Sequence, residues 1–100
     1  MLMVLAKAKL GEGALDAGRA AMETMINASR AEPGCISYAY AVDVLDPGML
    51  HIVEKWDDEA ALASHFAEPH MAEFRAALAE VGPQDLKVRM YEADPEPMPL

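Results

Sequence analysis

The fold is decided by residues 32–56, EPGCISYAYAVDVLDPGMLHIVEKW. The Pro-Gly pair near its start suits a tight turn, because proline fixes φ at about −65° and glycine tolerates positive φ. Large and small residues then alternate from 35 to 44, which is typical of a β-strand. Asp46-Pro47-Gly48 predicts a tight connection to a second strand at residues 49–56. The stretch is therefore a predicted β-hairpin.

The flanking segments predict two more strands and a set of helices. Residues 1–10 predict a strand that is apolar on both faces at its start, residues 84–93 alternate in polarity, and residues 14–31 follow helical spacing. Residues 57–81 predict a helix pair that breaks at Pro69, since proline is favoured in the first turn of a helix. With right-handed crossovers, this order gives an α+β fold: a ferredoxin-like βαββαβ unit whose helices cover one face of a four-stranded antiparallel sheet.

Length and composition limit the classes of protein. One hundred residues suffice for one domain, which we place at 1–93, followed by an extended Pro-rich tail at 94–100. A net charge of −9 argues against nucleic acid and against an anionic membrane surface as partners. The single cysteine, Cys35, excludes an intramolecular disulfide. The N-terminus lacks a signal-peptide pattern and no apolar run is long enough to span a membrane, so we expect a cytoplasmic protein.

The first strand indicates association. Residues 1–10 are apolar on both parities at their start, so both faces of the sheet are expected to be covered. The helices cover only one of them. In a chain this short, a second copy is the expected cover, which predicts a homodimer joined sheet to sheet.

Common cofactor and metal motifs are absent from the sequence. There is no glycine-rich phosphate loop, no paired-cysteine metal spacing, and no nicotinamide or flavin fingerprint. His65 and His70 are five residues apart with Pro69 between them, so they do not form the i, i+4 pair of a helical zinc site.

Polar and aromatic residues on the expected helix-facing side of the sheet are the candidates for chemistry. His65 shares an apolar stripe with Leu62 and Phe66, so it is either a hydrogen-bonded core residue or a general base, a role suited to a side chain with a free pKa of about 6.5. His70, in a first helical turn, is either a solvent-exposed or capping residue or a catalytic one. Trp56 is a core anchor or a pocket wall. We expect His51 to be structural or exposed.

Three further residues of the hairpin are of interest. Glu54 shares a parity with Trp56 and places a carboxylate on an apolar face, where we expect it to pair with Arg89 or with a cation of a second copy. Tyr38 and Tyr40 present hydroxyls either to a ligand or to the dimer interface.

Together these motifs resemble the antibiotic biosynthesis monooxygenase domain. The resemblance runs over residues 1–93 and is carried by EPGCISY at 32–38, DPG at 46–48, EKW at 54–56, AAL at 60–62, His65, Pro69-His70 and Phe74. It implies a ferredoxin-like subunit, a dimeric α/β barrel, and a pocket between sheet and helices in each subunit.

The resemblance also implies a chemistry. Members of this family oxygenate anthrones or quinols without metal, flavin or haem, because the deprotonated substrate itself donates an electron to dioxygen. No cofactor is therefore expected beyond O2 as co-substrate. By position, the catalytic residues are His65 and His70, and the substrate-binding residues are Trp56, Phe74, Tyr38 and Glu54.

We therefore hypothesise a small monooxygenase of an electron-rich phenol, quinol or anthrone-like substrate, with His65 slightly favoured as the base because its stripe is the buried one. Two alternatives stay open. The same pocket could isomerise or cyclise a small carbonyl metabolite, or the protein could be a non-enzymatic dimer that binds a small molecule.

Overall fold

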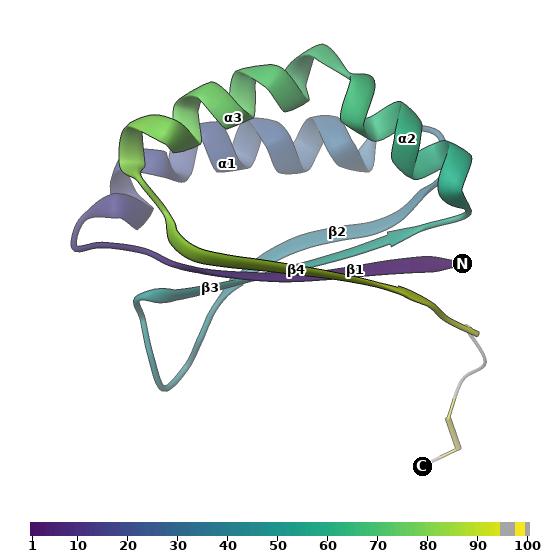
Figure 1. Cartoon of the computed structure of the whole chain (residues 1–100), viewed down its shortest axis with the longest axis horizontal. Coiled ribbons are helices and arrows are strands. Elements are labelled where there is room, and N and C mark those ends of the chain that lie inside the picture. Colours follow the sequence, from purple (N-terminus) through teal and green to yellow (C-terminus); the bar gives the residue numbers. More distant parts are fainter. Residues whose placement is uncertain (95–97, 100) are drawn as a thin grey trace.

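The computed structural model describes residues 1–94, 98 and 99. Its elements are β1 (Leu2–Lys9), α1 (Ala14–Arg30), β2 (Cys35–Val42), β3 (Met49–Trp56), α2 (Glu59–Ala67), α3 (Pro69–Val81) and β4 (Gln84–Glu92). The four strands form one sheet in the order β2-β3-β1-β4, with every neighbouring pair antiparallel (Figure 1). This confirms the predicted α+β class and the ferredoxin-like βαββαβ order. The predicted tail at 94–100 falls largely on residues 95–97 and 100, which lie outside the described part.

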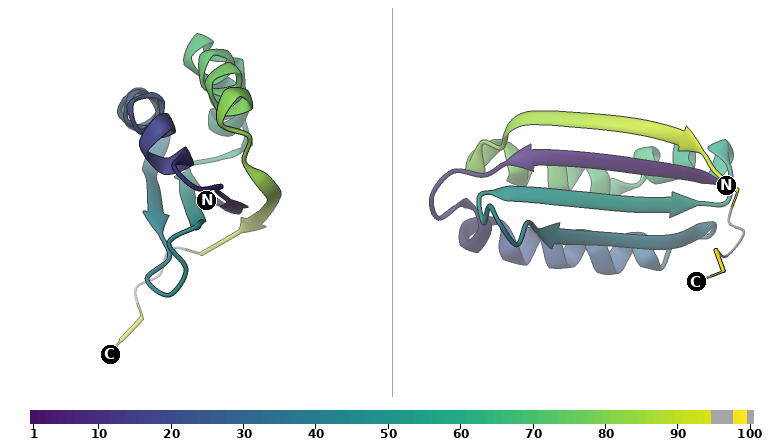
Figure 2. Two further views of the ribbon diagram at one scale, coloured as in Figure 1. Left: turned by 90° about the vertical axis from the view of Figure 1, so that its left-hand side faces the viewer. Right: turned by 90° about the horizontal axis from the view of Figure 1, so that it is seen from below.

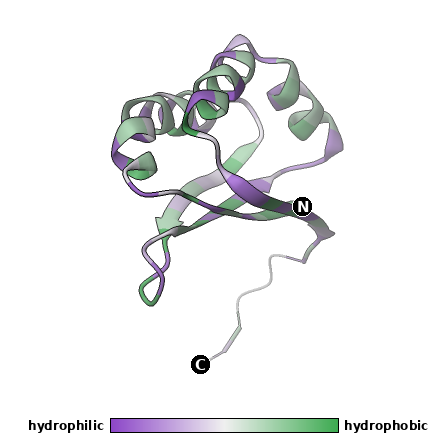
Figure 3. Ribbon diagram, turned by 60° about the vertical axis from the view of Figure 1, so that its left-hand side comes forward, coloured by the Kyte–Doolittle hydropathy of each residue, from purple (hydrophilic) through white to green (hydrophobic). Residues whose placement is uncertain are grey.

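The helices form one layer on one face of the sheet, and the opposite face is bare (Figures 1 and 2). Helix α1 packs over β2 and α2 over β3, while α1 and α3 run side by side. Along β1, Leu2, Val4 and Ala8 are buried beneath this layer. Figure 3 shows hydrophobic and hydrophilic residues in both the sheet and the helices.

The second strand ends two residues earlier than its sequence pattern suggested. The Asp43 carboxylate accepts hydrogen bonds from the backbone N–H of Leu45 (2.8 Å) and of Asp46 (3.1 Å). These bonds curl the chain into the hairpin turn. An aspartate that bonds the backbone two residues on competes with strand pairing, so β2 ends at Val42.

The turn before β2 lies directly against α2. Gly34 has φ +83°, and a Cβ built there would lie 2.6 Å from the Cβ of Ala61, so only glycine allows this close approach. The N–H of Asp57 also donates to the Gly34 carbonyl at 2.9 Å. Together these contacts bring the residues just before Gly34 next to helix α2.

Helices α2 and α3 meet at a sharp break. Asp58 caps α2 by accepting the Ala61 N–H at 2.9 Å, and α3 starts with Pro69. Leu62 and His65 are buried, but Phe66 is 50% exposed, so its predicted place on the buried stripe is wrong. The side chains of successive helical residues point about 100° apart around the helix axis. In the nine-residue helix α2, which packs on the sheet with one side, His65 is therefore buried and its neighbour Phe66 is not.

The last strand is the least covered element of the described chain. All residues of β4 are exposed. The register pairs Val4 with Met90 and Ala6 with Val88, so these β4 side chains share the helix-facing side, yet Met90 is 54% and Val88 58% exposed. No helix among the described residues has the length and apolarity needed to cross a membrane.

Candidate functional site

A carboxylate and two histidines meet at the end of the sheet where α2 passes to α3. One oxygen of Glu32, Oε2, lies 2.7 Å from Nδ1 of His65 and 3.1 Å from Nε2 of His70. The three side chains are poorly exposed: 8% for Glu32, 1% for His65 and 17% for His70. The turn at Gly34 positions the carboxylate, α2 supplies His65, and the first turn of α3 supplies His70.

The shared oxygen fixes which nitrogens carry protons. A carboxylate oxygen only accepts, so the ring nitrogens that face Glu32 are the donors: Nδ1–H of His65 and Nε2–H of His70. In the neutral imidazoles the lone pairs then lie on Nε2 of His65 and on Nδ1 of His70. Each histidine therefore keeps one basic nitrogen on the side away from Glu32.

A second buried carboxylate lies behind His65. Glu54 Oε1 accepts the indole Nε1–H of Trp56 at 3.1 Å and lies 3.9 Å from Nε2 of His65. Burial raises the pKa of the Glu54 carboxyl, and the hydrogen bond from Trp56 and the nearby His65 only partly oppose this. Glu54 is thus a buried carboxylate held by Trp56, close to His65 but beyond hydrogen-bond distance from it.

The predicted pairing of Glu54 with Arg89 is wrong. Strand β1 lies between β3 and β4, and Val4 faces Glu54 on one side and Met90 on the other. Since adjacent strand residues point to opposite faces, Arg89 projects from the bare face while Glu54 points toward the helices. Glu54 is instead paired within the helix-facing core.

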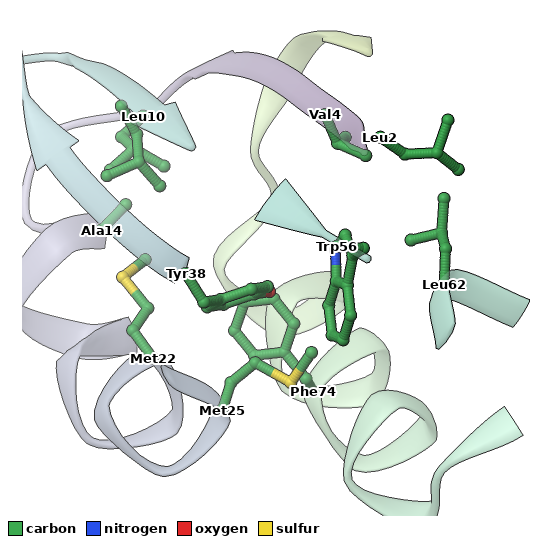
Figure 4. Close-up of a cluster of buried hydrophobic side chains, with 11 residues drawn as sticks. Leu2, Val4, Leu10, Ala14, Met22, Met25, Tyr38, Trp56, Leu62 and Phe74 are labelled. Atoms are coloured by element: carbon green, nitrogen blue, oxygen red, sulfur yellow. The ribbon is translucent and has the colours of Figure 1, made fainter. Parts of the chain in front are cut away.

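Aromatic rings surround His65. The His65 ring lies 4.5 Å from Trp56 and 5.6 Å from Tyr38, centroid to centroid. The hydroxyls of Tyr38 and Tyr40 are 2.8 Å apart, and burial raises both of their pKa values. Tyr40 packs 5.9 Å from Phe74. Figure 4 shows Trp56, Tyr38 and Phe74 gathered in one cluster beneath the helices.

Open space touches this cluster at His70 rather than at His65. Trp56 is fully buried and His65 is 1% exposed, so these two side chains fill the region between sheet and helices where the resemblance implies a pocket. A hollow of about 280 Å³ lies between α1 and α3. It is lined by Ala20, Ala21, Thr24, Met25, His70, Glu73 and Phe74.

All six candidate residues named from the sequence lie on the helix-facing side. The His65 ring contacts the rings of Trp56 and Tyr38, and Glu54 accepts a hydrogen bond from Trp56. Phe74 borders the hollow beside His70. His51, expected to be structural or exposed, bonds Asp43 at 2.8 Å outside this site, with 41% of its side chain exposed.

Comparison with known proteins places the chain in a family. Residues 1–77 match the family described as antibiotic biosynthesis monooxygenase. The chain belongs to this family. A Mycobacterium tuberculosis protein named "Putative monooxygenase Rv0793" is 36% identical over 63 residues, 63% of this chain and 61% of that protein. An uncharacterized Synechocystis protein is 33% identical over 70 residues, 70% of this chain. That match spans only 48% of the relative's length.

The solved structures agree at the level of the whole chain. A Deinococcus radiodurans protein that carries this family's name superposes with a TM-score of 0.89 at 28% identity, over 100% of this chain and 98% of its own. The fold of an antibiotic biosynthesis monooxygenase domain therefore extends through β4, beyond the matched residues 1–77.

Sequence reasoning missed Glu32 as a site residue. It was read only as the start of the turn that contains Pro33 and Gly34. The sequence did contain one signal. Glu32 lies just before the turn that leads into β2, and a carboxylate at such a position can reach a helix that packs on the sheet. The contact joins residues 33 and 38 positions apart in the chain, however, and no local pattern reports it.

Proposed function

We propose that this family member is a cofactor-independent monooxygenase of a small electron-rich phenol, quinol or anthrone, with O2 as co-substrate. The observation that carries the proposal is the carboxylate-linked pair of histidines, one of which opens onto a hollow lined by an aromatic ring. The relatives named as monooxygenases support the same class of reaction.

His70 is the proposed proton acceptor. Its Nε2–H is committed to Glu32, so its Nδ1 lone pair is free, and its ring borders the hollow. His65 has the same link to Glu32 but is enclosed by Trp56 and Tyr38. In this proposal His65 holds Glu32 in place, while His70 meets the substrate.

The proposed reaction balances without a reductant. His70 removes the phenolic proton, and the resulting anion passes one electron to O2. The two radicals combine to form a C–O bond, and loss of water from the peroxide leaves a carbonyl. A phenol plus O2 thus gives a quinone plus water, with one oxygen atom in each product. Phe74 gives the hollow an aromatic wall, which favours a flat ring, and Thr24 and Glu73 add polar groups.

The size of the hollow limits the substrate. Ligand pockets typically enclose about 300–1,000 Å³, and about 280 Å³ is available here. A flat system of one to three fused rings is within this volume, so phenols, quinols and anthrones are all proposed as substrates.

We also propose that the working form is a homodimer joined through the bare sheet face. A hollow of about 410 Å³ on that face is lined by the side chains of Leu5, Val53 and Tyr91 together with Lys7, Lys87 and Arg89. Apolar surface of this kind is typical of protein interfaces. Sedimentation should give twice the chain mass, and a monomer at micromolar concentration would contradict the assembly.

An oxygen electrode tests the reaction. Purified protein is offered monocyclic and bicyclic phenols and quinols, together with anthrones. We expect one O2 consumed per product, a loss of about 100-fold or more in His70→Ala, and no loss in Glu80→Gln, an exposed helix residue. Turnover that persists without oxygen would instead indicate an isomerase. Stabilisation by a ligand with no product formed would indicate a binding protein. Either result overturns the proposal.

A further inference from the structure

Metal-ligating atoms also come together in the side chains of Glu32, His65 and His70. Each offers one metal-ligating atom, and the three atoms lie within 4.8 Å of one another. Two imidazoles with one carboxylate form a ligand set of catalytic zinc sites and of non-haem iron sites. We infer that these three residues form a binding site for a divalent transition-metal ion of the zinc class.

The distances are close to those that a metal requires. Ligands at about 2.1 Å from a zinc ion are separated from one another by about 3.0–3.5 Å. Glu32 Oε2 is already 2.7 Å from His65 Nδ1 and 3.1 Å from His70 Nε2. Glu32 Oε2 and His65 Nδ1 need to separate slightly, and the two nitrogens, which are at most 4.8 Å apart, need to approach each other. His70, at 17% exposure in the first turn of α3, is the less enclosed of the two histidines.

The groups behind the ligands suit a bound metal. A metal-bound histidine usually donates its other N–H to a carboxylate. Nε2 of His65 lies 3.9 Å from Oε1 of Glu54, which is itself held by the indole N–H of Trp56. When a metal takes the Nδ1 lone pair, the ring proton moves to Nε2 and points toward this carboxylate. No net proton is released from neutral histidines.

The ligand types select the metal and leave it accessible. Two nitrogen donors favour zinc, cobalt, nickel or copper over magnesium and calcium, which prefer oxygen ligands throughout. Three protein ligands leave at least one position open for water, unlike a closed structural site. The hollow beside His70 provides the entry path.

Metal binding would change the chemistry of the same histidines. A metal at His70 Nε2 requires the ring proton to sit on Nδ1, which removes the lone pair that the proposed oxidation uses. The binding inference does not depend on the proposed oxidation, because it concerns only the ligand atoms that face Glu32. The two are tested separately.

Cobalt and zinc titrations test the site. Protein stripped with EDTA is titrated with Co2+, read by visible absorption, and with Zn2+, read by calorimetry, with Mg2+ as the negative probe. We expect one equivalent of Co2+ or Zn2+ to bind and no Mg2+. Loss of a residue that only contacts a metal ligand typically weakens metal binding by about 10- to 100-fold. His70→Ala and Glu32→Gln each remove a ligand, so each should weaken binding by more than this.

His51→Ala is the matched control, because His51 also contacts a carboxylate, that of Asp43, but with no third ligand. It should bind like the wild type. Thermal unfolding adds a readout on each folded variant: Zn2+ should raise the Tm of the wild type and of His51→Ala but not of His70→Ala. The inference is overturned if no stoichiometric binding occurs, if His70→Ala binds as tightly as the wild type, or if only His51→Ala loses binding.

Discussion

Replacing Glu32 with glutamine tests the centre of the site with the smallest change in shape. The carboxylate is 8% exposed and accepts two imidazole N–H bonds on one oxygen. Glutamine keeps an acceptor oxygen but loses the charge, and its NH2 group has no acceptor in place. Hydrogen bonds to charged groups contribute about 1.5–3 kcal/mol, against about 0.5–1.5 kcal/mol for neutral ones. With one bond short and one longer, the expected loss of unfolding free energy is about 2 kcal/mol.

That loss is measurable in two ways. For a domain of about this size, 1 kcal/mol shifts the Tm by about 4–8 °C, so Glu32→Gln should melt about 8–16 °C below the wild type. Urea denaturation at equal protein concentration gives the free energy directly. The control is Glu80→Gln, which makes the same charge change on an exposed helix position and should stay within about 0.5 kcal/mol.

The same variant should lose activity with little change in KM. Without the carboxylate, the histidines no longer have a fixed tautomer, so a smaller fraction presents the Nδ1 lone pair of His70 to the hollow. We expect kcat to fall at least about 10-fold, within the range for general-base catalysis. A Glu32→Gln protein with wild-type stability and wild-type kcat would refute the reasoning.

Three further outcomes are expected. Trp56→Phe leaves the buried Glu54 carboxyl without its indole donor and should cost about 1–3 kcal/mol in urea denaturation; no change would contradict the hydrogen bond. The hydrogen bond from His51, together with those from backbone N–H groups, lowers the pKa of Asp43 below that of an ordinary carboxyl group. Ionised Asp43 therefore stabilises the fold at pH values above the ordinary carboxyl pKa, and this stabilisation is lost as the pH falls through the lowered pKa. Asp43→Asn should therefore lower the unfolding midpoint near neutral pH but not in strong acid, and an equal effect at both would be contrary to this. Zn2+ should stop oxidation and EDTA restore it, because the metal occupies His70; activity that rises with Zn2+ would oppose the account.

The hairpin and the element order could be predicted because their signals are local. The Pro-Gly pair and the Asp46-Pro47-Gly48 turn each specify their own backbone, and strand alternation carries across the residues between them. The grouping of Trp56 and Glu54 on the helix-facing side follows from parity within one strand.

Contacts between distant elements could not be obtained in this way. Glu32 reaches two histidines only because Gly34 lets its turn approach Ala61, which is a matter of docking rather than of local pattern. The face on which Arg89 lies depends on the register of β4 against β1, which parity within β4 alone does not give. His65 is enclosed whereas His70 borders open space, and this difference depends on the direction in which α3 runs from its first residue, Pro69.

Isotope labelling tests the central claim most directly. The protein oxidises a bicyclic phenol under 18O2, and the product is analysed by mass spectrometry beside that of His70→Ala. The account expects one labelled oxygen atom per quinone and almost no product from the variant. Unlabelled product, or labelled product formed equally fast by His70→Ala, would contradict it.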